Sequence, residues 1–249
     1  MTATKSNRKR IIYLDVIRSL ACLMVITMHS PQPGTNGLLQ NVIYLATSPC
    51  IGLFFMVSGA LLLPVEGNGW EWVRRRLGKI LCPTVFWTLF YVLANTLTSR
   101  CEWSDVPNAL MSMPFSAQGH GILWFMYTLC GLYLLAPVIS PWLRLASRRE
   151  VECLLLLWVA TLFFPILRMF VSVNEGNTGM FYYFTGYGGY FLLGYYLRRY
   201  GLQISRFVWP LLILTPFVVA IACKQLRCEI DFYDLFWYLS VLCAMMALF

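Results

Sequence analysis

The fold follows first from residues 11–29, which read IIYLDVIRSLACLMVITMH. This mostly apolar run is close to the roughly 20 residues that cross the hydrocarbon core of a bilayer as a helix. Similar runs recur along the whole chain, at residues 11–30, 43–63, 80–98, 121–139, 152–173, 181–197, 207–223 and 233–249. We therefore predict an all-α, polytopic membrane protein.

The composition of the chain agrees with this prediction. Of the 249 residues, 59% are hydrophobic and only 12% are charged, whereas soluble domains carry about 25% charged residues. Disordered chains and ordinary soluble domains are therefore excluded. We expect no nucleic-acid partner, because the basic residues do not form the stripe that such proteins use.

The positions of the basic residues predict the orientation in the membrane. Fourteen of the 19 Lys and Arg residues lie at the N-terminus or in loops that follow even-numbered runs, and four lie in the opposite loops. The remaining one, Arg18, lies inside the first run. By the positive-inside rule, the N-terminus and the loops after even-numbered runs are cytoplasmic.

The first and the last apolar run decide how many spans the chain has. The first run is long, contains two charged residues and lacks a clear cleavage site, so we expect a retained helix rather than a signal peptide. We expect one transmembrane domain over residues 1–249, with seven full spans and an eighth that ends abruptly at Phe249.

The nine cysteines include no C-x-x-C pair, and we expect no metal site. Cys101 and Cys228 both fall in predicted outer loops, and whether they pair stays open.

Polar residues in the first run point to chemistry. Arg18 and His29 are 11 residues apart, or about 1,100° of helix, so they share a face at a separation of about 16 Å. Asp15 lies three residues before Arg18 and can pair with it. A charge inside a span costs about 2.5–3.5 kcal/mol on insertion scales, so we expect Asp15, Arg18, Cys22 and His29 to face the interior of the bundle. Two simpler interpretations remain: a structural ion pair, and a histidine that caps a helix end at the interface.

Four motifs in order point to a known family. They are the Arg18–His29 pair with ten residues between, GLFFMVSG at 52–59, RRRLGKILCP at 74–83, and HGILWF at 120–125. In these motifs the chain resembles the membrane-bound acyltransferase family 3, in particular its bacterial surface-polysaccharide O-acetyltransferases. Members have about ten spans, so the resemblance implies a chain truncated at its C-terminus, with about eight helices present.

The resemblance implies a reaction, cofactors and partners. An acetyl or similar short acyl group would move from cytoplasmic acetyl-CoA, the acyl donor, to a hydroxyl of a cell-surface sugar or polysaccharide precursor. The enzyme would be a multi-pass protein of the bacterial plasma (inner) membrane. Its partners would be the lipid bilayer, acyl-CoA and a carbohydrate acceptor, without a metal.

Catalytic roles in such a reaction fall on the first run. His29 would be the general base, or alternatively the carrier of an acyl-histidine intermediate. Arg18, held by Asp15, would donate to a carbonyl of the donor. Candidate binding residues are Arg74, Arg75, Arg76 and Lys79 for the CoA phosphates, and His120, Trp124 and Ser58 for the substrate.

Each binding candidate has a simpler interpretation. The basic cluster can be a positive-inside anchor of the third span. Trp124 can belong to the aromatic belt, and Ser58 can serve close helix packing beside Gly59. Two other functions also stay open: a transporter of polysaccharide or lipid-linked sugar, and a non-catalytic membrane module on the same scaffold.

Overall fold

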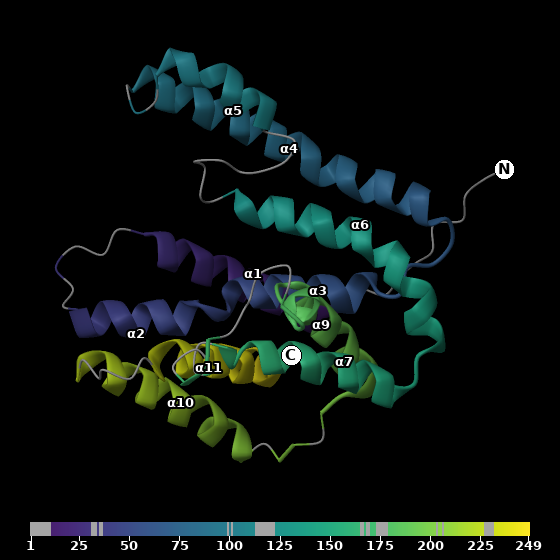
Figure 1. The fold of residues 1–249 in the computed structure, drawn as a ribbon, viewed down its shortest axis with the longest axis vertical. Coiled ribbons are helices and arrows are strands. Elements are labelled where there is room, and N and C mark those ends of the chain that lie inside the picture. Colours follow the sequence, from purple (N-terminus) through teal and green to yellow (C-terminus); the bar gives the residue numbers. More distant parts are fainter. Residues whose placement is uncertain are drawn as a thin grey trace. The chain divides into compact units, whose positions relative to one another are not determined.

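The chain forms helices, and no strand occurs among the residues that the structure describes. This computed structural model describes residues 11–30, 34, 37–98, 100, 102–112, 123–164, 167, 170–172, 179–202, 204, 205, 207–226 and 232–249, with only the backbone for 232–237. In chain order the elements in Figure 1 are α1 (Ile12–His29), α2 (Gly37–Thr47), α3 (Pro49–Leu62), α4 (Gly69–Leu97), η1 (Trp103–Asp105), α5 (Val106–Ser112), α6 (Trp124–Leu145), α7 (Arg148–Thr161), η2 (Tyr182–Phe184), α9 (Gly188–Tyr200), α10 (Val208–Gln225) and α11 (Phe232–Leu248).

Five helical stretches of the described chain are long and apolar enough to cross a membrane. They are Ile12–His29, Gly37–Leu62, Gly69–Leu97, Trp124–Leu145 and Val208–Gln225. They correspond to the first four and the seventh of the predicted runs, which confirms the all-α, multi-pass prediction. The second stretch joins α2 and α3 across a turn at Ser48, where Pro49 has no N–H to continue the helical hydrogen bonding.

The other three predicted runs contain shorter helices than we expected. α7, α9 and α11 have 14, 13 and 17 residues, which is less than the roughly 20 of a full span. For α9 the reason lies in its flanking glycines. Gly186 and Gly201 have φ values of 89° and 66°, and these left-handed conformations interrupt helical geometry on both sides of α9.

A reciprocal pair of hydrogen bonds begins α7. The Ser147 N–H donates to Glu150 Oε2 at 2.6 Å, and the Glu150 N–H donates to Ser147 Oγ at 3.4 Å. This is the capping box that satisfies free amides at a helix start. The Ser147 hydroxyl and N–H stabilise the carboxylate and hold the pKa of Glu150 below its ordinary value.

The chain divides into two compact units. Unit 1 comprises Met1–Leu61 and Glu152–Phe249, and unit 2 comprises Leu62–Val151. Unit 1 is thus assembled from both ends of the sequence, while unit 2 is a continuous segment.

In unit 1, α3 and α9 cross in direct backbone contact. A Cβ atom added to Gly59 would lie 1.7 Å from the carbonyl oxygen of Phe191, and one added to Gly194 would lie 1.9 Å from that of Met56. Only a hydrogen atom fits at both positions, as in other membrane helix pairs that meet through small residues. Gly59 therefore serves close helix packing.

An arginine ties the same two helices together at one end. Arg198 Nη1 of α9 donates to the carbonyl oxygen of Ala60. Ala60 lies in the last turn of α3, where carbonyl groups have no partner within the helix. The long side chain therefore caps α3 from its neighbour.

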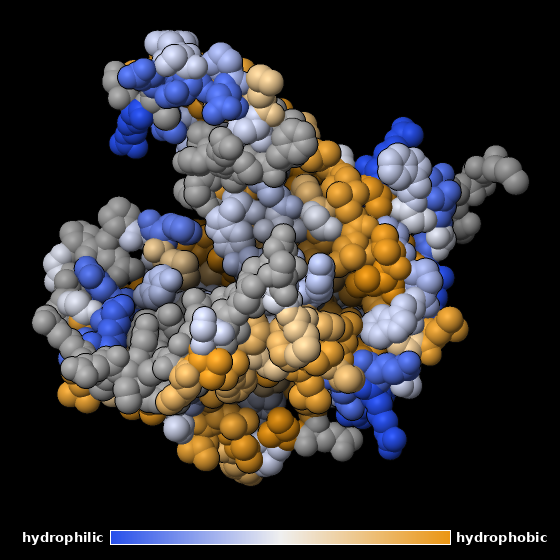
Figure 2. Space-filling view, in the orientation of Figure 1, coloured by the Kyte–Doolittle hydropathy of each residue, from blue (hydrophilic) through white to orange (hydrophobic). Residues whose placement is uncertain are grey.

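The surface of the described residues is rich in apolar side chains. Figure 2 shows broad hydrophobic areas, with hydrophilic residues gathered toward the edges. Only 17% of α1 and 11% of α10 are buried, against 78% of the most apolar 18 residues within Gly37–Leu62. α3 therefore supplies an interior helix of unit 1, whereas α2 buries only Leu45 and Thr47, and α1 and α10 present apolar side chains to lipid.

In unit 2, α4 and α6 lie side by side (Figure 1). The loop before α4 is fastened to α6: the Val65 N–H donates to Ser140 Oγ at 2.7 Å, and Arg144 Nη2 donates to the Val65 carbonyl oxygen. Both backbone polar groups of Val65 are thus satisfied by one helix. The start of α4 is held in a fixed position against α6.

Candidate active site

α1 packs through three apolar residues on one side. Leu14, Ile17 and Ala21 are the buried residues of this helix, and α1 contacts α2. These side chains are aliphatic and small, so their burial costs no polar solvation. They fix which side of α1 faces protein.

The polar stripe of α1 lies on the flank next to that packed side. Positions 15, 18, 22 and 29 fall about 100° around the helix from positions 14, 17 and 21. Our expectation that the stripe faces the interior of the bundle is not met in the described structure, because Arg18, Cys22 and His29 are exposed and Asp15 is half-buried. The physical reason is that apolar side chains fill the buried side of α1 at no cost in polar solvation, which leaves the charged groups on the flank.

Asp15 and Arg18 lie close together, as their spacing predicts. Arg18 Nη1 is 3.9 Å from Asp15 Oδ1, and the two side chains are 44% and 33% exposed. A partly exposed pair at this distance contributes little to stability. Its effect is to restrict the orientation of the guanidinium on the flank of α1.

His29 is the last residue of α1. It is exposed, and the chain leaves helical geometry at Ser30, whose hydroxyl donates to the Ile26 carbonyl oxygen at 2.6 Å. The imidazole therefore lies at the end of the same flank, about 16 Å along the axis from Arg18. It is accessible to a molecule that approaches this end of α1.

The predicted CoA-binding residues lie in the first three turns of α4 rather than in a loop before it. α4 begins at Gly69 because the Asn68 side chain accepts hydrogen bonds from the N–H groups of Trp70 and Glu71. This places the whole basic run inside the helix, 11 residues earlier than the predicted start at position 80. Of the four basic residues, Arg74, Arg75 and Lys79 are exposed and Arg76 is half-buried.

One arginine of this cluster is held in place by aromatic contacts. The guanidinium of Arg76 lies 5.9 Å from the centre of the Trp72 ring, and Trp72 packs edge-on against Tyr133 of α6 at 5.7 Å. Close to the same helix start, a Cβ on Gly69 would lie 2.9 Å from Pro137. Together with the Val65 bonds, these contacts hold the first turn of α4 against α6 and the Arg76 side chain against Trp72.

The remaining predicted residues are not brought into one cluster. Ser58 lies on α3 and is 8% exposed. Trp124 is the first residue of α6 and packs edge-on against Phe125 at 6.5 Å. His120, Cys101 and Cys228 lie outside the described residues. Unit 1 thus carries Asp15, Arg18, His29 and Ser58, and unit 2 carries the basic cluster and Trp124.

Sequence reasoning missed the residues that fix these groups in place. Ser140 and Arg144 hold the loop before α4, and Arg198 caps α3. In the sequence, Arg144 and Arg198 could be interpreted only as basic residues that follow the positive-inside rule. Nothing in the spacing of Ser140 signalled a partner 75 residues earlier in the chain.

A comparison with protein families decides the identity of the fold. The family described as an acyltransferase domain, acyltransferase 3, matches residues 11–249. The chain belongs to this acyltransferase family. The family resemblance expected from the four motifs is thereby confirmed. The acyltransferase match includes both the stripe of α1 and the basic residues of α4. No curated protein and no solved structure matched the chain.

Proposed function

We propose that this acyltransferase moves an acetyl or similar short acyl group from cytoplasmic acyl-CoA to a hydroxyl of a cell-surface sugar or polysaccharide precursor. The proposal places it in a bacterial plasma membrane with a cytoplasmic N-terminus. The observation that carries it is the common flank of α1, which presents an oriented guanidinium and, about 16 Å further on, an accessible imidazole. In a chain of an acyltransferase family, such a pair suits a donor and an acceptor that arrive from opposite sides.

His29 is the proposed general base. The acceptor hydroxyl gives its proton to the imidazole while its oxygen attacks the thioester carbonyl. A C–O bond forms, the C–S bond breaks, and the proton then passes to the sulfur of CoA. Positioned base catalysis of this kind contributes about 10²- to 10⁴-fold in rate.

Arg18 is the proposed donor to the thioester carbonyl or to the pantetheine amides. Hydrogen bonds from a charged group are stronger than neutral ones. The 3.9 Å contact with Asp15 keeps the guanidinium on the flank. The pair supports this role because a fixed donor loses less side-chain entropy when it binds.

The basic end of α4 is the proposed site for the CoA phosphates. Arginine can donate two parallel hydrogen bonds to a phosphate. The contacts from α6 support this assignment over a simple membrane anchor, because an anchor needs no fixed geometry. Trp124, His120 and Ser58 are retained as proposed substrate contacts.

Radiolabel transfer from acetyl-CoA in membranes tests the proposal. His29→Ala should lose at least about 100-fold in transfer while it keeps CoA binding. Thr27→Ala is the matched control, because Thr27 lies two residues away on a different side of α1 and its hydroxyl is bonded to the Leu23 carbonyl. Equal transfer by wild type and His29→Ala would remove His29 from the chemistry.

The same preparation separates the remaining interpretations. An acyl-histidine intermediate would leave radiolabel on the protein after rapid quenching without an acceptor, and direct transfer would not. A transporter or a non-catalytic module would give no label transfer in the wild type under any acceptor condition.

A further inference from the structure

The turn before α9 is fixed to α7 through two glycines. Trp158 Nε1 of α7 donates to the carbonyl oxygen of Gly186 at 3.0 Å, and Gly186 has the left-handed φ of 89°. A Cβ added to Gly189 would lie 2.0 Å from the Trp158 ring, so this close approach needs a glycine. Trp158 itself is 2% exposed. Tyr187 and Gly188, which lie between the two glycines, are therefore held against α7 from both sides.

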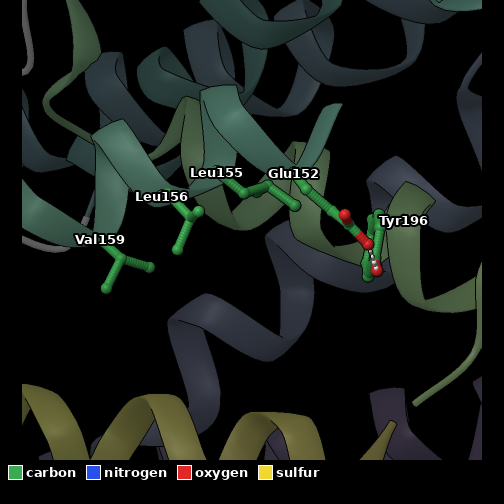
Figure 3. Close-up of a pocket in the computed structure, with 5 residues that line it drawn as sticks. All are labelled: Glu152, Leu155, Leu156, Val159 and Tyr196. Carbon is green, nitrogen blue, oxygen red and sulfur yellow. Dashed lines mark hydrogen bonds between the residues drawn. The ribbon is translucent and has the colours of Figure 1, made fainter. Parts of the chain in front are cut away.

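A second hydrogen bond joins α7 and α9 further along. The Tyr196 hydroxyl of α9 donates to Glu152 Oε1 of α7 at 2.5 Å, the dashed line in Figure 3. Beyond Glu152, the apolar side chains of Leu155, Leu156 and Val159 line an open groove along α7 (Figure 3). The two helices are thus joined at two separate points, which fixes where α9 begins.

Tyr187 combines a packed side with an exposed one. Its ring lies 5.1 Å from the ring of Phe55 on α3 and 6.4 Å from that of Tyr190 on α9. Phe55 is completely buried, so it is a fixed support for the Tyr187 ring. Tyr187 remains 39% exposed with all of its neighbours in place. It therefore presents a supported aromatic surface rather than a freely rotating side chain.

The chain on both sides of Tyr187 carries no charge. Residues 176–197 contain no Asp, Glu, Lys, Arg or His. A phosphate group would find no cation in this segment, whereas an uncharged sugar needs none. The C–H groups on one face of a sugar ring carry partial positive charge, which the negative face of an aromatic ring attracts. A fixed, partly exposed tyrosine in an uncharged segment therefore suits a neutral sugar ring.

We propose that Tyr187 binds the carbohydrate acceptor by stacking against one of its sugar rings. This inference rests on the proposed function, which makes the acceptor a sugar, and it adds the residue that holds the sugar ring. The turn belongs to the predicted outer side, because α9 ends with Arg198 and Arg199, which are predicted to be cytoplasmic. His29 ends α1 on the same predicted side.

Saturation-transfer NMR tests the proposal on the full chain in lipid nanodiscs, because glycoside detergents would compete. The probes are methyl β-glucoside and methyl β-galactoside, and sorbitol is the acyclic control without a ring face. Both glycosides should receive saturation at their ring C–H protons and bind more tightly than sorbitol. Tyr187→Leu keeps an apolar contact with Phe55 but has no aromatic face, so the Kd for the glycosides should rise about three- to ten-fold. Tyr187→Phe keeps the ring and should retain binding.

Tyr183→Leu is the matched control. Tyr183 lies four residues earlier in the same segment, is 80% exposed and packs edge-on against Tyr182, so this change should leave the Kd as it is. No saturation transfer to either glycoside in the wild type would overturn the proposal. So would equal losses in the two leucine variants, as expected of tyrosines that only contact lipid headgroups, or an equal loss in Tyr187→Phe and Tyr187→Leu.

Acetyl transfer measured on the same variants separates this inference from the proposed function. A chain that binds the glycosides through Tyr187 but transfers no acetyl group to any acceptor would refute the proposed function and leave the sugar contact standing. Normal transfer by Tyr187→Leu, with an unchanged KM for the acceptor, would refute the sugar contact alone.

Discussion

Arg18 is the charged residue of α1 that pairs with a carboxylate on the same helix. It lies on a helix flank, 3.9 Å from Asp15, and its side chain is 44% exposed. A structural ion pair at this exposure would contribute at most about 1 kcal/mol. A functional arginine would instead stabilise a bound carbonyl group. Replacing Arg18 would then slow acyl transfer, whereas replacing a purely structural arginine would not.

The first prediction concerns this residue. Arg18→Ala should lower kcat/KM for acetyl transfer about ten- to 100-fold, because a hydrogen bond to a charged group contributes about 1.5–3 kcal/mol. Arg18→Lys should recover part of this loss, since it keeps the charge beside Asp15 but not the planar fork. Steady-state kinetics in membranes measures both variants, and unchanged kinetics in Arg18→Ala would make the residue structural.

Residue spacing predicts only part of this site. The common face of Arg18 and His29 follows from helical geometry, because both residues lie on one helix. Which side of α1 packs against protein does not follow, because it depends on the surfaces of helices elsewhere in the chain. The structure, and not the spacing, therefore shows that Arg18 and His29 lie on a flank of α1 beside its buried side.

At the scale of elements, the first turns of α4 show why a basic run can be more than an anchor. Val65, Gly69 and Trp72 all contact α6, so the helix start has one position within unit 2. Sequence patterns predict the helix and its charges. They do not predict these contacts with α6, because the partners lie about 60 to 75 residues further along the chain.

The second prediction tests the charges on α4. Raising the salt concentration from 0.05 to 0.5 M (about a three-fold shorter Debye length) should weaken CoA binding several-fold, because salt screens exposed charge pairs. Arg75→Gln together with Lys79→Gln should reduce that salt dependence. Lys224→Gln, on α10, is the control and should leave it unchanged. Isothermal titration calorimetry measures the affinities, and a salt-independent Kd would contradict the assignment.

The third prediction concerns the crossing of α3 and α9. Gly59→Ala places a methyl group 1.7 Å from a backbone carbonyl oxygen, so the variant should lose about 1–3 kcal/mol of stability or more. Gly131→Ala is the matched control, because a Cβ at this helical position meets nothing within 4 Å. That change should be neutral or slightly stabilising. Thermal unfolding in detergent compares the two, and equal melting temperatures would contradict the close contact.

At the scale of the whole molecule, the charge distribution predicts which loops lie on which side. Gly34 and Gly67 are exposed, have positive φ values and have open space around them. They lie in loops on opposite predicted sides, after the first and the second span. Such positions tolerate insertions well.

The fourth prediction uses these two loops. A protease site inserted after Gly34 should be cleaved in spheroplasts with an intact plasma membrane, and one inserted after Gly67 should be cleaved only after lysis. Immunoblotting of the fragments measures the outcome. The reversed pattern would overturn the cytoplasmic N-terminus, and with it the side from which the donor arrives.

The contact between Gly59 and Phe191 also constrains how the polypeptide is made. These two residues are separated by about 130 positions, and at about 5–20 residues per second the ribosome needs on the order of 10 s to synthesise that length. During this interval the side of α3 that carries Gly59 lies in the bilayer without its contact to α9. Nascent chains arrested after α7 should therefore be degraded faster than chains arrested after α9. Pulse-chase labelling would measure the two lifetimes, and equal lifetimes would show that α3 is protected by other means.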